Sequence, residues 1–133
     1  MSSYKRRTMN KEEVVKRLQE LNYPISEYWL VAGGAMVLYG LRENTSDIDL
    51  GCTKVLADQL EKHGFSTSIL EDGSRRISVA EDIEIFEDWL FDKIEIRQDI
   101  PIISLKGLLE MKKSLGREKD QQDIRLIEKA LQN

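Results

Sequence analysis

The chain has 133 residues, 41% of them hydrophobic and 33% charged, which suits one domain with its own core and leaves little room for a second. The formal net charge of −4 argues against bulk binding of nucleic acid, which usually requires a strongly basic domain. No apolar stretch approaches the roughly 20 residues that a membrane-spanning helix needs, which excludes such a helix.

The first segments predict a helix followed by a buried strand. Asn10 with Glu13 three residues later is typical of a helix N-terminus, because each side chain can cap the other's backbone amide. Four apolar residues then fall on one helical face: Val14, Val15, Leu18 and Leu21. Residues 22–26 end this helix, and the apolar run 28–32 predicts a short buried strand.

The next stretch predicts a helix, a strand and a second helix. Gly33-Gly34 follows the strand directly, and the apolar run 35–41 predicts a helix of about two turns. Residues 47–52 alternate between polar and apolar, as in a strand with one buried face. Thr53 can cap the following helix, which we expect to end near Gly64.

The remaining chain predicts several strands and then two helices. The expected strands are 65–70, 75–79, 83–86, 93–97 and 100–103, the last two as edge strands. Ser104 and Gly116 bound one helix, and the last helix has Ile124, Ile127 and Leu131 on one face. This order predicts an α/β or α+β fold in one domain, residues 1–133, with a mixed sheet flanked by helices and two C-terminal helices.

Two carboxylates stand together in the second predicted strand. Side chains two residues apart in a strand share a face, so Asp47 and Asp49 point one way while Ile48 and Leu50 enter the core. Like charges this close raise each other's pKa unless a cation intervenes, and hard oxygen ligands favour Mg²⁺ or Mn²⁺. The alternative is a solvated strand face that carries two acids.

The glycine pair precedes these acids by one connection. Glycines at a strand-to-helix junction let backbone amides of Gly33 and Gly34 approach a ligand closely, and the start of a helix favours phosphate. The alternative is a tight turn with no ligand. Together the two features predict an anion cradle beside a metal-binding pair.

The run LVAGGAMVLYGLRENTSDIDL, residues 30–50, resembles the signature of the nucleotidyltransferase superfamily. That signature is a glycine pair that opens a helix, a polar loop, and Asp-x-Asp on the next strand. The resemblance implies that Asp47 and Asp49 bind metal and that Gly33 and Gly34 hold phosphate. It also implies that three loop residues, Arg42, Thr45 and Ser46, lie near the triphosphate.

The later run IISLKGLLEMKKSLGREKDQQDIRLI, residues 102–127, looks like the tail of small stand-alone members of that superfamily. These include minimal nucleotidyltransferases of toxin–antitoxin systems and lincosamide nucleotidyltransferases. The two motifs together span about residues 28–130, and neither identifies an acceptor substrate.

The resemblance implies a third acid on a neighbouring strand, which helps to hold a second metal and can accept the acceptor's proton. Glu84 is the candidate, because it lies between Ile83 and Ile85 and leaves the core on the opposite face. The family more often has aspartate there. Asp82, on the same strand face, is the alternative, and Glu95 has similar patterning but fits the family spacing less well.

Lys112 lies within the apolar stripe of its helix, so its ammonium group must reach water or meet an anion. The resemblance implies that this anion is a nucleotide phosphate or Glu84. Arg117 and Asp120 follow at a helix junction, where we expect an ion pair that locks the two last helices together rather than a catalytic role.

The resemblance implies a metal-dependent enzyme that moves a nucleoside monophosphate from a nucleoside triphosphate, with ATP as the expected nucleotide, to a hydroxyl on a small molecule, protein or RNA. The alternative is a non-catalytic module on the same fold that binds a nucleotide or a partner, as a toxin–antitoxin component or at a homodimer interface.

The remaining expectations concern partners and compartment. A basic start (Lys5, Arg6, Arg7) and a basic group in the tail (Lys106, Lys112, Lys113, Arg117, Lys119) are the features that favour an RNA acceptor, which the acidic balance opposes. The start has no apolar segment behind it, so we expect no signal peptide, and a single cysteine, Cys52, allows no internal disulfide. The cytoplasm is the expected compartment.

Overall fold

A computed structural model of the chain describes residues 7–133, so Lys5 and Arg6 of the basic start lie outside the described part. The helices are α1 (Lys11–Leu21), α2 (Ala32–Leu38), α3 (Lys54–Lys62), α4 (Leu105–Leu115), the short 3-10 helix η1 (Glu118–Asp120) and α5 (Gln121–Leu131). The strands are β1 (Tyr28–Val31), β2 (Ile48–Cys52), β3 (Ser66–Ile69), β4 (Arg75–Ala80), β5 (Ile83–Glu87), β6 (Ile94–Arg97) and β7 (Ile100–Ile103). None of the helices in this range is long and apolar enough to cross a membrane.

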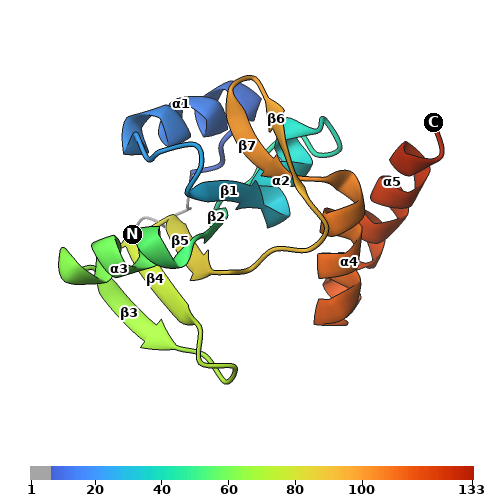
Figure 1. The fold of residues 1–133 in the computed structure, drawn as a ribbon. Helices are drawn as coiled ribbons and strands as arrows, with labels where there is room; N and C mark the ends of the chain where they lie inside the picture. The colour runs from blue at the N-terminus through green and yellow to red at the C-terminus, as the bar shows by residue number, and fades with distance from the viewer. Residues whose placement is uncertain (1–6) are drawn as a thin grey trace, which may run out of the picture.

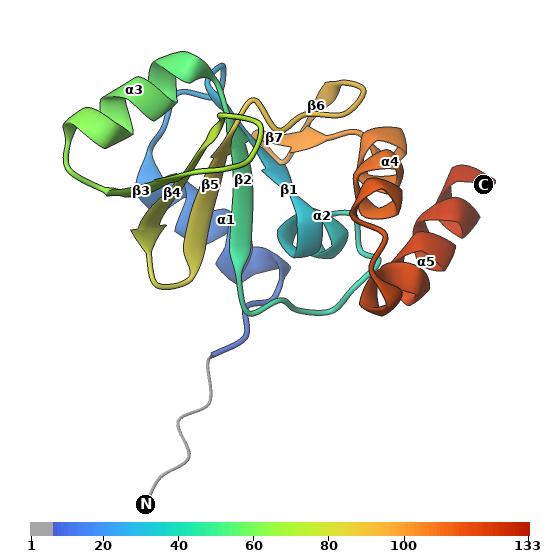
Figure 2. The ribbon, with the colours of Figure 1, turned by 90° about the horizontal axis from the view of Figure 1, so that it is seen from below.

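The strands form one mixed sheet with the order β3-β4-β5-β2-β1-β7-β6 (Figure 1). Strand β2 pairs parallel with β5 and antiparallel with β1, and β7 pairs parallel with β1. Helices α4 and α5 pack together at one end of the molecule (Figure 2). The predicted fold class, a mixed sheet flanked by helices with two helices at the C-terminal end, is confirmed.

One prediction of strand position is wrong. Strand β6 is an edge strand as expected, but β7 lies between β1 and β6 with all four residues buried. Its sequence, Ile-Pro-Ile-Ile, is apolar throughout, which is typical of a strand covered on both faces rather than of an exposed edge.

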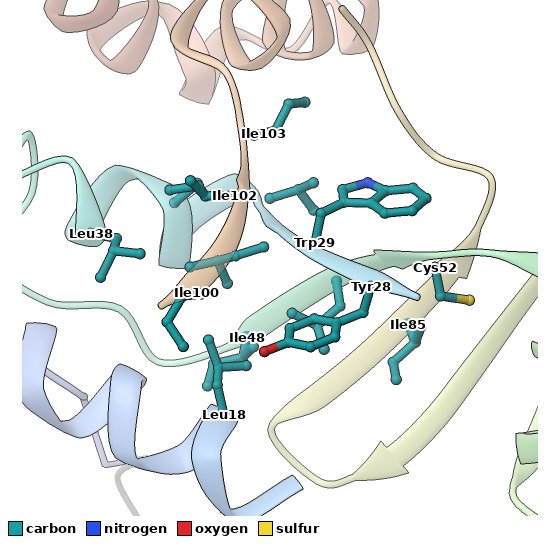
Figure 3. Packing of buried hydrophobic residues seen from close by; sticks show 14 of the residues in the cluster. Leu18, Tyr28, Trp29, Leu38, Ile48, Cys52, Ile85, Ile100, Ile102 and Ile103 are labelled. Carbon is teal, nitrogen blue, oxygen red and sulfur yellow. The ribbon is translucent and has the colours of Figure 1, made fainter. Parts of the chain in front are cut away.

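One face of the sheet carries a row of fully buried core residues. Four fully buried residues stand opposite one another across neighbouring strands: Ile77 on β4, Ile85 on β5, Leu50 on β2 and Leu30 on β1. Leu18 of α1 packs close to Ile48 on this side (Figure 3). Each such side chain contributes about 1.5–3 kcal/mol when it leaves water, so this face is a major source of the fold's stability.

The predicted helix ends are confirmed at four places. Asn10 and Glu13 form a reciprocal capping box, Thr53 accepts from the Leu56 amide, and Ser104 accepts from the Gly107 amide. Gly116 closes α4 with φ +60°, a conformation that glycine adopts without strain.

The junction between β1 and α2 differs from the prediction. The helix starts at Ala32 and contains both glycines, whereas we expected it to start at residue 35. The left-handed turn falls on Ala32, with φ +54°, so neither Gly33 nor Gly34 supplies it. The glycines are required for close packing instead. A Cβ on Gly34 would lie 2.8 Å from Leu30 Cδ1 in the core.

Candidate active site

Asp49 and Glu84 lie side by side on the sheet face opposite the buried row that contains Leu50. The parallel register of β2 and β5 sets Asp49 directly against Glu84, and Leu50 against Ile85. Because side chains alternate along a strand, the two acids point away from the buried row. Asp47 is two residues before Asp49, just outside the strand. The sheet therefore brings together the three acids that the sequence singled out.

The environment of Asp49 disfavours its negative charge. Burial, then the neighbouring charge of Glu84, then that of Asp47 raise the pKa of Asp49 from its ordinary 3.8 to about 6, while Arg76 and Arg117 oppose the rise. A carboxylate in such a place is stabilised by any cation that reaches it. Functional sites often hold groups of this kind, because crowded acids reduce the stability of the fold and are used in binding and catalysis.

Arg76 of β4 holds Glu84. The Arg76 Nε donates to Glu84 Oε2 at 2.7 Å, and Nη2 lies 2.6 Å from the same oxygen. Within residues 7–133, no three histidine, cysteine or acidic side chains converge closely enough to hold a metal ion as they stand. Glu84 is thus beside Asp49 but engaged with an arginine that sequence reasoning did not single out.

The other two acids considered for the third position lie elsewhere. Asp82 pairs with Arg17 of α1, with 3.1 Å between Arg17 Nη2 and Asp82 Oδ1. Glu95 is exposed on β6, at the far edge of the sheet from β5. Of the three, Glu84 alone stands against Asp49.

Gly33 supports the loop that leads to Asp47. A Cβ on Gly33 would lie 2.7 Å from Thr45 Oγ1 and 3.1 Å from Arg42 Nη1. The Thr45 hydroxyl donates to the Asp47 carbonyl at 3.0 Å, and Thr45 also pairs through its backbone with Met9. Packing therefore explains why a glycine is needed at position 33 without any ligand, because the missing side chain lets Thr45 approach α2.

We predict that Gly33→Ala displaces the loop and moves Asp47. The added methyl group must push Thr45 away from the Asp47 carbonyl, so we expect a loss of about 1–3 kcal/mol in unfolding free energy. Urea denaturation measures it. Gly40→Ala, at a glycine with open space around its Cβ position but φ +78°, separates the clash from the general cost of replacing glycine. A Gly33→Ala protein as stable as the wild type would contradict the packing role.

Lys112 lies at the centre of a buried ionic cluster. Its Nζ is 3.0 Å from Asp123 Oδ2 and 3.3 Å from Asp120 Oδ1, and all three residues are at least 94% buried. Arg42 of the loop also binds Asp123, and Arg117 binds Asp120 at 2.6 Å. The expected Arg117–Asp120 ion pair is confirmed. The cluster ties the loop before Asp47 to the two C-terminal helices.

Sequence reasoning missed Asp123. Its sequence signal is the i, i+3 spacing from Asp120, which places two carboxylates on the side of the junction that meets Lys112. Part of the basic group in the tail is neutralised within the protein, since Lys112 and Arg117 meet these acids and Lys113 pairs with Glu128.

Two cavities meet at Asp49. The larger, of about 840 Å³, is lined by Glu84, Arg76 and an apolar wall that includes Phe86, Trp89 and Met111. The smaller, of about 490 Å³, is lined by the loop residues Arg42, Thr45 and Ser46 together with Gly33 and Asp47. Four residues line both: Ala32, Asp49, Lys112 and Arg117. Gly34 lines neither.

The fold, a mixed sheet with two helices at its C-terminal end, is similar to that of a solved nucleotidyltransferase. Among solved structures, the chain is similar to the lincosamide antibiotic adenylyltransferase LnuA, determined with lincomycin bound. The match has a TM-score of 0.55 and 20% sequence identity and covers 88% of this chain and 96% of that one. No protein-family model matches the sequence, and no curated protein matches it.

Proposed function

We propose that this protein is a metal-dependent nucleotidyltransferase that moves a nucleoside monophosphate, with ATP as the expected donor, to a hydroxyl acceptor. The observation that carries the proposal is the alignment of Asp49 with Glu84 across β2 and β5, at the point where two cavities meet. The similarity in fold to an adenylyltransferase supports it.

The smaller cavity suits the nucleotide. Its wall offers Arg42 and Lys119 as positive charges and Thr45 and Ser46 as hydrogen-bonding side chains, a chemistry that suits a triphosphate. Lys112 borders it as well, and its contact with phosphate stays a prediction because its ammonium group is held by two carboxylates here. Gly33 lines this cavity and Gly34 does not, so the cradle would rest on Gly33.

The larger cavity suits the acceptor. It combines an apolar wall with Glu84, the strand neighbour of Asp49. In the proposed reaction an acceptor oxygen forms a bond to the α-phosphorus while the bond to the β-phosphate oxygen breaks, so that pyrophosphate leaves. Glu84 would take the proton from the acceptor hydroxyl. A ligand or metal that draws Arg76 or Glu84 from their ion pair would free the carboxylate for that role.

Two of the three proposed metal ligands, Asp47 and Asp49, are suited to a divalent cation. Asp47 and Asp49 supply hard oxygen ligands, and the raised pKa of Asp49 marks a place where negative charge lacks compensation. Glu84 would complete the set once released from Arg76. A Mg²⁺ or Mn²⁺ ion bound there would neutralise the triphosphate and lower the pKa of the acceptor hydroxyl.

The choice between the two candidate third acids gives a direct test. We expect Glu84→Gln to reduce Mg²⁺-dependent release of pyrophosphate from ATP by about 100-fold or more, since general base catalysis typically contributes 10²–10⁴-fold. The matched control, Asp82→Asn, removes a carboxylate two residues away that faces Arg17, and should keep wild-type turnover. The assay uses a panel of hydroxyl acceptors: lincomycin, serine and tyrosine peptides, and tRNA. Equal loss in both variants would contradict the assignment of Glu84.

The ion pair between Arg76 and Glu84 also favours a second function, a non-catalytic nucleotide- or partner-binding module. If Arg76 stays paired with Glu84, the protein would bind a nucleotide but would not transfer its nucleoside monophosphate. Calorimetry with ATP, with and without Mg²⁺, separates the two. Metal-dependent binding without pyrophosphate release from any acceptor in the panel would support the binding module over the enzyme.

A further inference from the structure

Strand β6 is an open edge of the sheet. It pairs with β7 on one side and ends the strand order on the other, at the margin of the molecule in Figures 1 and 2. All of residues 92–99 are exposed. Ile94 and Ile96 are 39% and 57% exposed, although both are isoleucines of strand β6. Open edges of this kind pair readily with another strand.

The backbone of β6 is oriented for such pairing. The Ser104 amide donates to the Lys93 carbonyl at 2.9 Å across the β6–β7 ladder. In an antiparallel pair, residues whose backbone N–H and C=O groups point to the partner strand alternate with residues whose groups point away. Lys93, Glu95 and Arg97 therefore bond to β7. Ile94 and Ile96 therefore direct their N–H and C=O groups away from the sheet.

The charges along this segment are self-complementary. Residues 93–99 read Lys-Ile-Glu-Ile-Arg-Gln-Asp. When β6 lies antiparallel to a second copy of itself with Ile96 opposite Ile96, Glu95 faces Arg97 of the second copy. Both charged residues of β6 then meet the opposite charge, and the two-fold symmetry forms this pair twice.

We propose that two copies of this chain pair edge to edge through β6, antiparallel and centred on Ile96, to form one continuous sheet across a two-fold axis. Within residues 7–133, neither Glu95 nor Arg97 has an ion-pair partner in its own chain. Arg97 rests with its Cζ 4.9 Å from the centroid of the Tyr39 ring, which orders its guanidinium group on the same face as Glu95.

Other pairings of the same edge are less favourable. Centring on Glu95 sets the two Glu95 carboxylates against each other and Lys93 against Arg97, so like charges repel throughout. Centring on Ile94 sets Lys93 against Glu95 but leaves Arg97 opposite Phe91 and Ile96 opposite Asp92. The charge pattern thus selects one register of the three that outward-facing backbone groups permit.

The opposite edge of the sheet lacks this pattern. Strand β3 reads Ser-Thr-Ser-Ile and carries no charge, so it offers neither a preferred register nor an attraction between copies. The proposal therefore assigns the interface to β6 and not to β3.

A charge exchange in the full-length protein tests this pairing. We expect the wild type to sediment as a dimer at high micromolar concentration. Arg97→Glu sets Glu95 against a glutamate, and Glu95→Arg sets an arginine against Arg97, so each variant should weaken the dimer about tenfold or more in sedimentation velocity. A mixture of the two variants should form a heterodimer, since arginines at both positions of one copy then face glutamates at both positions of the other. The double variant Glu95→Arg/Arg97→Glu should also dimerise.

Arg125→Glu is the matched control, an exposed arginine of α5 with the same change of charge, and it should leave the dimer intact. Thermal unfolding followed by circular dichroism checks that each variant is folded. Rescue in the mixture supports the pairing, because loss of folding in the single variants cannot produce it. A wild-type protein that stays monomeric, or a dimer that none of the β6 variants weakens, would overturn the proposal.

Discussion

Asp49→Asn is expected to abolish nucleotidyl transfer and at the same time to make the metal-free protein more stable. The amide keeps the size and one hydrogen-bonding oxygen of the carboxylate but removes the charge that a divalent cation requires. We expect transfer to fall by about 1,000-fold or more, because electrostatic stabilisation of the reacting phosphate is lost together with the metal. Mg²⁺-dependent release of pyrophosphate measures this loss.

The gain in stability follows from the pKa of Asp49. Burial and the charges of Glu84 and Asp47 raise it to about 6, so the folded protein holds this carboxyl's proton more tightly than the unfolded chain does. The favourable contribution of the protonated form is complete below pH 3.8 and is lost as the pH rises through about 6. Above that pH the charge costs on the order of 3 kcal/mol at about 1.4 kcal/mol per pKa unit.

The difference between the variant and the wild type should therefore depend on pH. In EDTA, Asp49→Asn should unfold at a higher urea concentration than the wild type above pH 6, and the two should converge below pH 4. Added Mg²⁺ should raise the stability of the wild type and leave the variant unchanged. Glu110→Gln, at an exposed carboxylate of α4, is the control for the loss of one negative charge.

The transfer assay and the stability measurement test two separate claims. Unchanged transfer in Asp49→Asn would contradict the proposed function, whatever the stability. Unchanged stability above pH 6 would contradict the crowding of charge at Asp49 and remove the structural reason to expect a cation there, even if transfer were lost.

Strand alternation made the placement of Asp47 and Asp49 on one face predictable. The order Asp-Ile-Asp-Leu sets Asp47 and Asp49 on one face and two apolar residues on the other wherever the strand lies in the sheet. Helix ends were also predictable from local sequence, since Asn10, Thr53 and Ser104 cap amides only three residues away. Local geometry decides these features.

The partners of the site residues could not be predicted in this way. Arg76 reaches Glu84 because β4 pairs with β5, and Lys112 reaches Asp123 because α4 packs on α5. The apolar stripe on α4 required Lys112 to reach either water or an anion, and it did not say which. Similarly, two adjacent glycines suggested the turn before α2, whereas the chain places the left-handed residue at Ala32 and uses the glycines for close contact.

Lys112→Met is expected to be the most destabilising of the changes considered. Methionine is similar in length but carries no charge, so Asp120 and Asp123 lose the ammonium group between them. Burial raises the pKa of Asp120, but Arg117 and Lys112 outweigh it, and the net pKa is below its usual range. Removing one partner of a buried ion pair typically costs about 3–5 kcal/mol, because the remaining charge stays away from water.

The neighbouring lysine provides the comparison that decides between a buried and a solvated interaction. Lys113 lies on the same helix, is 55% exposed in its side chain and pairs with Glu128 at 3.5 Å, so Lys113→Met should change the unfolding free energy by less than about 1 kcal/mol. Urea denaturation at pH 7 measures both variants. Because Asp120 has a lowered pKa, its ion pairs stabilise the fold above the carboxyl's ordinary pKa and are lost as the pH falls through its lowered value. The difference in unfolding free energy between the wild type and Lys112→Met should therefore become smaller on acidification. Equal losses of unfolding free energy for the two lysine variants at neutral pH would contradict the role of the cluster in holding α4, α5 and the Asp47 loop together.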